Sequence, residues 1–175
     1  MADRTGIGAS AYLEALQKAG VTHFVTVPDF VQLALHQAVE RGASPIRLIR
    51  VCNEDQAVCT AAGLRIAGRQ PVVVVQNQGL YACINTIRAV ALDARIPTVF
   101  LVGQFGRENA NAGLPTTRSS RRVVNLLEPL LETLNVPFWR LDEPSDLSAV
   151  DQAFDVATVR RGAAVLIVNQ PIGWH

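Results

Sequence analysis

The sequence predicts an α/β fold: one doubly wound, about six-stranded parallel sheet with helices on both faces. Strand-like and helix-like segments alternate along the chain, and strict alternation favours parallel strands joined by helical crossovers. The run at residues 71–76 contains four consecutive valines, which is typical of a strand buried on both faces. At 175 residues the chain suits one core, so we expect a single domain over residues 1–175.

The first half of the chain contains three helix-like and three strand-like segments. Apolar positions at helical spacing precede Gly20 in the first of them, and Asp29 and Gly42 flank the second helix as expected caps. Asn53 and Gln56 have the spacing of a capping box at the start of the third helix. In chain order we expect a helix over 8–19, a strand over 22–27, a helix over 29–42, a strand over 45–51, a helix over 53–68 and a strand over 71–76.

The second half continues the alternation around one long irregular stretch. Residues 103–120 are rich in Gly, Asn, Ser and Thr, which predicts a loop. A loop of this length in a compact domain is usually a lid or an interaction segment. The remaining expected elements are a helix around 79–93, a strand over 97–102, a helix over roughly 120–134, a strand over 137–141, a helix over 145–160 and a strand over 163–168.

Composition argues against several classes of function. The net charge of +1 gives no electrostatic footprint for nucleic acid, and no apolar run approaches the ~20 residues that span a bilayer. The three cysteines, Cys52, Cys59 and Cys83, are an odd number without metal-ligand spacing, which favours a reduced, cytoplasmic setting. His, Cys and acidic residues do not cluster, so we expect no metal site built by this chain.

Polar residues follow four of the expected strands, where an open parallel sheet binds its ligands. No glycine-rich dinucleotide fingerprint and no phosphate-binding loop is present. Two acids stand out, and each has two readings. Glu54 is either a reactive carboxylate or a helix-dipole partner, and Asp29 is either a site residue or an N-cap. The residues at these strand ends are Pro28, Asp29, Cys52, Asn53, Glu54, Gln76, Asn77, Gln78, Gly79, Gly103 and Gln104.

Two blocks carry a family resemblance. The first is "NEDQAVCTAAGLRIAGRQP" from residue 53, and the second is "QNQGL" from residue 76, with Asn85 downstream. Their order and spacing resemble the pyrimidine-binding domain of thiamine diphosphate enzymes, which has the thiamine diphosphate-binding fold. Among these enzymes the chain most resembles the alpha subunits of sulfopyruvate decarboxylase and the matching half of phosphonopyruvate decarboxylase. The resemblance extends over nearly the whole chain.

The resemblance implies roles for individual residues. Glu54 would contact N1′ of the cofactor's aminopyrimidine ring and favour the imino tautomer of its amino group. A carboxyl group in a water-poor crevice can share a proton with such a nitrogen. Glu54 and Asp29 would be catalytic, with Asp29 near the reacting carbon as a proton relay. The cofactor-binding residues would be Glu54, Pro28, Gln76, Asn77, Gln78, Gly79 and Asn85.

The resemblance also implies a partner. Family members bind the diphosphate through Mg²⁺ on a domain with a Gly-Asp-Gly motif, which this sequence lacks. We therefore expect thiamine diphosphate and Mg²⁺ as cofactors, with the metal ligands on a separate beta subunit, in an α2β2 or larger assembly. The expected activity is decarboxylation of a small 2-oxo acid. The alternatives are an acetolactate synthase-like carboligase subunit and a non-catalytic α/β binding module.

Some positions depart from the sulfopyruvate and phosphonopyruvate enzymes. Gln78, Phe30 and the pair Tyr81-Ala82 replace smaller or more polar residues, which makes the expected pocket bulkier. The histidine often found after the fourth strand is missing from residues 103–122. Four arginines in that stretch are either substitutes for the lost anion contacts or solvated side chains: Arg107, Arg118, Arg121 and Arg122.

Overall fold

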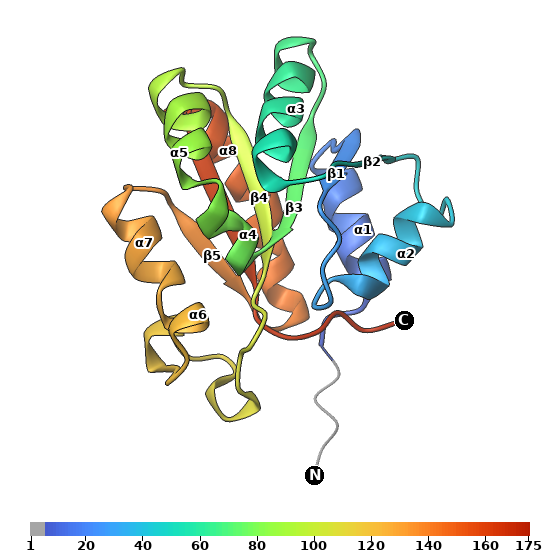
Figure 1. The fold of residues 1–175 in the computed structure, drawn as a ribbon. Helices are drawn as coiled ribbons and strands as arrows, with labels where there is room; N and C mark the ends of the chain where they lie inside the picture. Colours follow the sequence, from blue (N-terminus) through green and yellow to red (C-terminus); the bar gives the residue numbers. More distant parts are fainter. Residues whose placement is uncertain (1–5) are drawn as a thin grey trace.

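The computed structural model of the protein describes residues 6–175 and contains one six-stranded sheet (Figure 1). Every neighbouring pair of strands is parallel, and the strand order is β2-β1-β3-β4-β6-β5. The predicted doubly wound α/β fold is confirmed. The strands are β1 His23–Thr26, β2 Arg47–Arg50, β3 Pro71–Gln76, β4 Thr98–Gly103, β5 Phe138–Leu141 and β6 Ala163–Val168.

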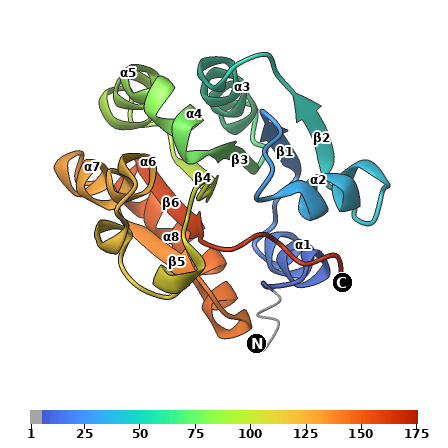
Figure 2. The same ribbon diagram turned by 60° about the horizontal axis from the view of Figure 1, so that its bottom comes forward.

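Helices cover both faces of the sheet (Figure 2). Helices α1, α2 and α8 share a core with one face, whereas α3, α4, η1 and α7 share a core with the other. No helix of the described residues is both long and apolar enough to cross a membrane. The helices are α1 Ala9–Lys18, α2 Leu33–Glu40, α3 Glu54–Ile66, α4 Asn77–Ala82, α5 Ile84–Thr86, η1 Ile87–Asp93, η2 Asn109–Asn111, η3 Thr116–Arg118, α6 Arg122–Asn125, α7 Leu127–Thr133, η4 Pro144–Ser148 and α8 Ala149–Arg160.

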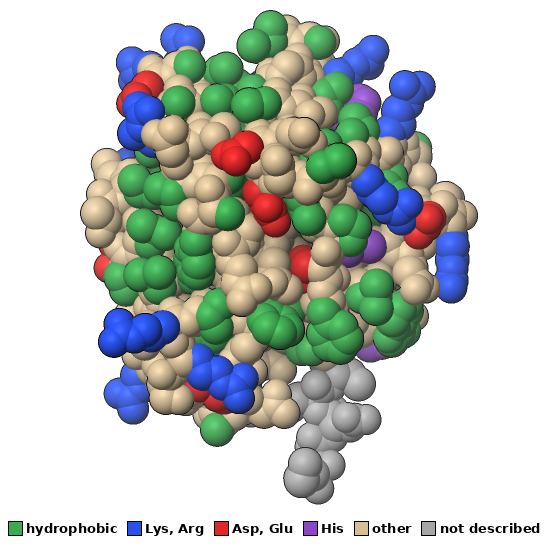
Figure 3. Space-filling model, in the orientation of Figure 1, with side chains coloured by type: hydrophobic (Ala, Val, Ile, Leu, Met, Phe, Trp, Pro, Cys, Tyr) green, Lys and Arg blue, Asp and Glu red, His purple; other side chains and the backbone are tan. Residues whose placement is uncertain are grey.

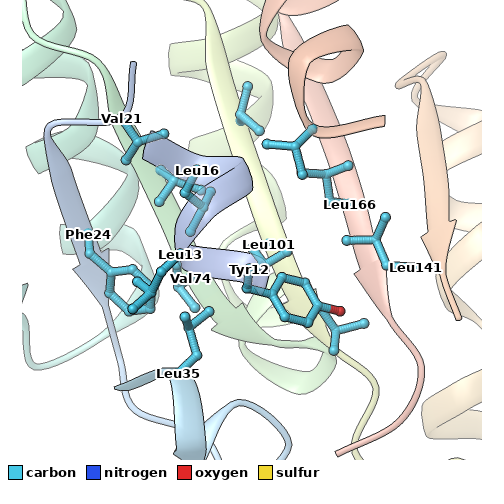
Figure 4. Packing of buried hydrophobic residues seen from close by; sticks show 14 of the residues in the cluster. Tyr12, Leu13, Leu16, Val21, Phe24, Leu35, Val74, Leu101, Leu141 and Leu166 are labelled. Carbon is cyan, nitrogen blue, oxygen red and sulfur yellow. The ribbon is translucent and has the colours of Figure 1, made fainter. Parts of the chain in front are cut away.

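The valine run of β3 contributes to both cores. Val72 and Val74 join the cluster under α1, whereas Val73 and Val75 join the cluster under α3. This alternation follows from the two-residue period of a strand, which points successive side chains to opposite faces. Figure 4 shows the first cluster, where Tyr12, Leu13 and Leu16 of α1 lie over Val74 and Leu101. Each fully buried apolar side chain of this size contributes roughly 1.5–3 kcal/mol.

The helix expected over residues 29–42 begins later than predicted. Its first helical residue is Leu33, with Gln32 at the N-cap position, so the expected capping role of Asp29 is wrong. Asp29 still accepts the backbone N–H of Gln32 at 3.0 Å, but this bond closes an irregular turn ahead of the helix. The Asn53 cap of α3 is confirmed, since its side chain accepts from the Gln56 N–H. The Gln56 side chain accepts from Cys52, one residue before the expected partner.

The helices expected around 79–93 and over 120–134 are both divided. The first starts at Asn77, directly after β3, and becomes a π-helix in η1. The second breaks at Leu126 into α6 and α7. Pro129 accounts for this break, because it lacks the N–H that would bond the carbonyl of Asn125 four residues earlier. The long loop over 103–120 is confirmed as largely irregular and contains two short 3-10 turns.

The strand order shows where in the sheet two successive connections run in opposite directions. From β1 the chain passes through α2 to the edge strand β2, whereas from β3 it passes through α4, α5 and η1 to β4 on the other side. These connections cover opposite faces. Because β1 and β3 are neighbours, their carboxyl ends form the switch point where open α/β sheets bind ligands.

Candidate functional site

Glu54 lies over Gly79 at the carboxyl edge of the sheet. It is the first residue of α3, held in place by the Asn53 cap, and its side chain is half-buried. A Cβ atom added to Gly79 would lie 2.1 Å from the Oε1 atom of Glu54. Only glycine therefore allows this carboxylate to occupy its position over the first turn of α4.

The Glu54 carboxylate makes no hydrogen bond or ion pair with residues 6–175 in the structure. Its neighbour Asp55 differs in this respect, because it accepts a hydrogen bond from the Thr86 hydroxyl at 2.5 Å. Gly79 thus leaves room for the Glu54 carboxylate, and both of its oxygens are without a partner among the described residues. A carboxylate in this state can accept a hydrogen bond from, or share a proton with, a group that comes from outside the chain.

Asp29 is the second acid at this edge, and it is buried, with 7% of its surface exposed. The Gln32 backbone N–H donates to its Oδ1 atom at 3.0 Å, and the Gln32 side-chain amide donates to its Oδ2 atom at 2.7 Å. Burial raises the pKa of Asp29, and the Gln32 hydrogen bonds partly oppose that rise. Gly103 leaves room for the carboxylate, because an added Cβ there would lie 2.8 Å from Oδ1.

His36 supports the same turn from α2. Its Nε2 atom accepts the backbone N–H of Asp29 at 3.2 Å, and its ring meets Phe24 edge-on with ring centres 5.2 Å apart. Burial lowers the pKa of His36 to about 4, with a smaller contribution from the Arg50 charge. The ring is therefore neutral at physiological pH and acts as an acceptor. No local sequence motif indicates this contact, because seven residues separate His36 from Asp29.

Asn77 is fully buried, and its amide binds the long loop. The Nδ2 atom donates to the carbonyl oxygens of Val123 at 2.7 Å and Phe105 at 3.1 Å, and to Oε1 of Gln104 at 3.1 Å. Its Oδ1 atom accepts the N–H of Gln78 at 3.0 Å. These bonds use both ends of the amide inside the chain. Asn77 thus fixes loop 103–123 against the start of α4.

The other expected site residues differ in their surroundings. Pro28 and Gln78 are exposed at the same edge, and Gln76 is half-buried as the N-cap residue of α4. Asn85 lies farther along the chain on α5, exposed, and its side-chain oxygen accepts from Arg88 at 3.0 Å. The structure therefore pairs Glu54 with Gly79, and it binds the Asn85 oxygen to a neighbouring arginine.

The loop arginines fall into two groups. Arg107 donates to backbone carbonyl oxygens of its own loop, and Arg121 donates to the Gly106 carbonyl at 2.9 Å. Arg118 and Arg122 are exposed. On the face shown in Figure 3, several acidic side chains lie near the centre, whereas Lys and Arg lie mainly toward the edges.

The described residues contain no group of three or more His, Cys, Asp or Glu side chains that could hold a metal ion. Carboxylates at this edge are instead separated, with Glu54 on α3 and Asp29 in the β1–α2 turn.

Comparison with known proteins gives a family match and several relatives. The family described as "Thiamine pyrophosphate enzyme, N-terminal TPP binding domain" matches residues 7–123. The sulfopyruvate decarboxylase subunit alpha of Methanocaldococcus jannaschii is 25% identical over 141 residues, which cover 79% of each chain. The corresponding subunit of Methanococcus maripaludis is 25% identical over 169 residues, covering 95% of this chain and 96% of the relative.

A solved structure agrees with the fold. The 2-oxoglutarate:ferredoxin oxidoreductase from Magnetococcus marinus superimposes with a TM-score of 0.69 at 15% identity, covering 92% of this chain and 28% of that one. At this identity the likeness concerns the fold alone. The matched family segment includes β1 to β4 and therefore both acids of the edge.

Proposed function

Because this chain belongs to the family of thiamine pyrophosphate enzymes, through their N-terminal TPP binding domain, we propose that it is an alpha subunit of a thiamine diphosphate-dependent decarboxylase. Its substrate would be a small 2-oxo acid of the sulfopyruvate or phosphonopyruvate type. Residues 1–175 would form one pyrimidine-binding domain. Relatives named as alpha subunits of sulfopyruvate decarboxylase, which match most of their length, support this assignment.

The observation that carries the proposal is the Glu54 carboxylate over Gly79. Its two oxygens are without partners among the described residues, and it occupies space that only glycine at position 79 leaves open. A ring nitrogen of an aminopyrimidine is a weak base that can share a proton with a carboxyl group at this position. The residues present therefore fit the pyrimidine half of thiamine diphosphate.

Each residue of the edge then has a definite task. When bound, the cofactor would supply an electron sink for decarboxylation. Glu54 holds a proton at the pyrimidine nitrogen and so controls the protonation state of the ring. Asp29, whose pKa is raised by burial, holds a proton to a higher pH than an exposed aspartate and delivers it at the reacting carbon. Pro28, Gln76 and Gln78 would line the pocket beside them.

A beta subunit would complete the site. It would carry the Gly-Asp-Gly motif, the Mg²⁺ ligands and the diphosphate contacts, and assemble with this chain as α2β2 or larger. The exposed side of Glu54 would then face the partner, which excludes water from the carboxyl group and strengthens its interaction with the ring. Alone, this chain is expected to bind the cofactor weakly and to be inactive.

The test uses the reconstituted assembly and two matched variants of neighbouring acids. Glu54→Gln should lower the rate of carbon dioxide release by about 10²–10⁴-fold, the range of a lost acid–base group. Asp55→Asn, one residue along the same helical turn, should leave the rate within a few fold. Near-normal turnover of Glu54→Gln in an intact assembly would refute the proposed role.

Product analysis separates decarboxylation from carboligation. We expect 2-oxo acid turnover to release carbon dioxide and aldehyde in equal amounts. With an added acceptor aldehyde or oxo acid, an acetolactate synthase-like enzyme would instead convert most substrate into a coupled product. A non-catalytic binding module would bind no thiamine diphosphate with any partner, which calorimetry on the assembly can detect.

A further inference from the structure

Gln32 is a buried polar residue at the carboxyl edge that the proposed chemistry leaves without a role. Its side chain is 0% exposed, although glutamine is mostly an exposed residue in folded proteins. It lies one residue before α2, in the irregular segment that begins at Asp29. Burying its amide there costs free energy unless its hydrogen bonds are made, so its position calls for an explanation in terms of those bonds.

The side-chain Nε2 atom of Gln32 contacts three elements. It donates to Oδ2 of Asp29 at 2.7 Å, to the carbonyl oxygen of Val75 at 3.1 Å and to that of Leu101 at 3.3 Å. Val75 and Leu101 lie near the carboxyl ends of the adjacent strands β3 and β4. The shortest of the three contacts is to the carboxylate, as expected for a charge-assisted hydrogen bond.

The Oε1 atom of Gln32 is buried without a hydrogen-bond partner in the described structure. A buried acceptor left unpaired is destabilising, because it has lost its hydrogen bonds to water without replacement. Helix capping does not account for this cost, because the backbone N–H of Gln32 already bonds Asp29 and a small apolar side chain would leave that bond in place. The hydrogen bonds that the amide nitrogen donates therefore account for the burial of this side chain.

We propose that Gln32 is a positioning residue that holds the Asp29 carboxylate on the carboxyl ends of β3 and β4. The backbone and side chain of Gln32 each bind one carboxylate oxygen, which fixes the rotation of the group. Gly103 leaves the space that the carboxylate occupies, because an added Cβ there would lie 3.0 Å or less from both carboxylate oxygens. The importance of this positioning for catalysis rests on the proposed function, whereas the contact between Gln32 and Asp29 does not.

The protonation of Asp29 should depend on Gln32. Burial raises the pKa of Asp29, and the largest opposing contribution is the side-chain hydrogen bond from Gln32. His36 is the titratable group that contacts this turn from α2, and its neutral ring accepts a backbone N–H. Arg50 on β2 acts on His36, and β3 and β4 present only carbonyl oxygens to the Gln32 amide.

The direct test is the titration of the Asp29 carboxyl carbon in the full chain by NMR. Gln32→Met keeps the length of the side chain and removes the donor, so the Asp29 midpoint should move to higher pH. The matched control is Gln37→Met, which replaces a half-buried glutamine on α2 and should leave the midpoint unchanged. An unchanged midpoint in Gln32→Met would overturn the inference.

A second measurement needs no variant of Gln32 and applies if Gln32→Met fails to fold. In the wild-type chain, the side-chain N–H signals of Gln32 should shift with pH at the same midpoint as the Asp29 carboxyl carbon. That shift should vanish in Asp29→Asn. Gln32 signals that do not respond to the Asp29 titration would overturn the inference as well.

Turnover by the assembly separates the inference from the proposed function. In Gln32→Met, kcat/KM should fall on the order of 100-fold, as expected for a misplaced reacting group, and its pH profile should move upward with the Asp29 midpoint. A shifted NMR midpoint with an unshifted pH profile would support the positioning of Asp29 by Gln32 and refute the catalytic role of Asp29. No shift in either measurement would refute the positioning role of Gln32.

Discussion

The β1–α2 turn and the β2–α3 turn each place one carboxylate at the same edge of the sheet, yet the two carboxylates differ in burial and in hydrogen-bond partners. Asp29 is buried and bound at both oxygens by Gln32. Glu54 is half-buried and makes no side-chain hydrogen bond within residues 6–175. The difference is that the Asp29 carboxylate is bound by its own chain, whereas both oxygens of the Glu54 carboxylate are without a partner among the described residues.

Both turns also share a steric device. Each carboxylate lies against a glycine of a neighbouring element, Gly79 for Glu54 and Gly103 for Asp29. Glycine at these two positions leaves room that any other residue would fill. Substitutions at the glycines therefore change the position of each carboxylate without changing its chemistry, and they test the comparison directly.

Gly79→Ala should have the largest effect. The new Cβ would lie 2.1 Å from Oε1 of Glu54, so the carboxylate must leave its position. Decarboxylation by the assembly should fall on the order of 1,000-fold, about 4 kcal/mol, similar to loss of an acid–base group. A crystal structure of the variant should show Glu54 rotated away. Full activity of a variant in which Glu54 is displaced would show that catalysis does not depend on the position of this carboxylate.

His36 makes the stability of the β1–α2 turn depend on pH. Burial lowers its pKa to about 4 in the folded chain, from the value of 6.5 that is ordinary for histidine. Its contribution to the free energy of unfolding is therefore complete above pH 6.5 and lost as pH falls toward 4, by about 3 kcal/mol. Urea unfolding at pH 7, 5.5 and 4 should show this loss in the wild type and a smaller loss in His36→Gln. Parallel pH curves for the two proteins would contradict the prediction.

Gly103→Ala should destabilise the chain by about 2 kcal/mol, within the usual range for overpacking. The added Cβ would lie 2.8 Å from Oδ1 of Asp29 and 3.0 Å from the Cβ of Val31. Thermal unfolding of the full chain measures the effect. Combining Gly103→Ala with Asp29→Gly should recover part of the loss if the carboxylate is the clashing group, and no recovery would assign the clash to Val31.

Gly63→Ala should have the smallest effect and the opposite sign. Gly63 lies inside α3, is exposed, and has no atom within 4 Å of an added Cβ. Alanine in a helix interior is favoured over glycine by about 0.5–1 kcal/mol. Urea unfolding of the full chain should show that gain. A Gly63→Ala chain that is less stable than the wild type would contradict this prediction. It would mean that the distances from an added Cβ to nearby atoms do not predict the effect of replacing a glycine in this chain.

Much of the fold could be predicted because its signals are local. The valine run of β3, the Asn53 cap and the alternation of segments each depend on a few adjacent residues. The start of α2 was misplaced because Asp29 binds Gln32, and Gln32 is held in turn by the carbonyl oxygens of β3 and β4. Tertiary contacts of this kind override local helix propensity.

The candidate site divides in the same way. Their places after strands make Glu54 and Asp29 candidate site residues. The sequence does not indicate the inward amide of Asn77, since its partners Phe105 and Val123 belong to a distant loop. Gln32 was missed for a related reason. A glutamine beside an aspartate has no distinctive pattern until the strands that receive its amide are placed.

The sequence by itself determined the parallel α/β architecture, the edge that bears the polar residues, and the family to which the chain belongs, because periodicity and motif spacing are properties of adjacent residues. Only the tertiary structure decided which carboxylate is bound and which is left available. That outcome depends on β1 lying between β2 and β3, which places Glu54 over Gly79 and Asp29 beside Gly103. Strand order is set by the packing of the whole sheet, and no local segment encodes it.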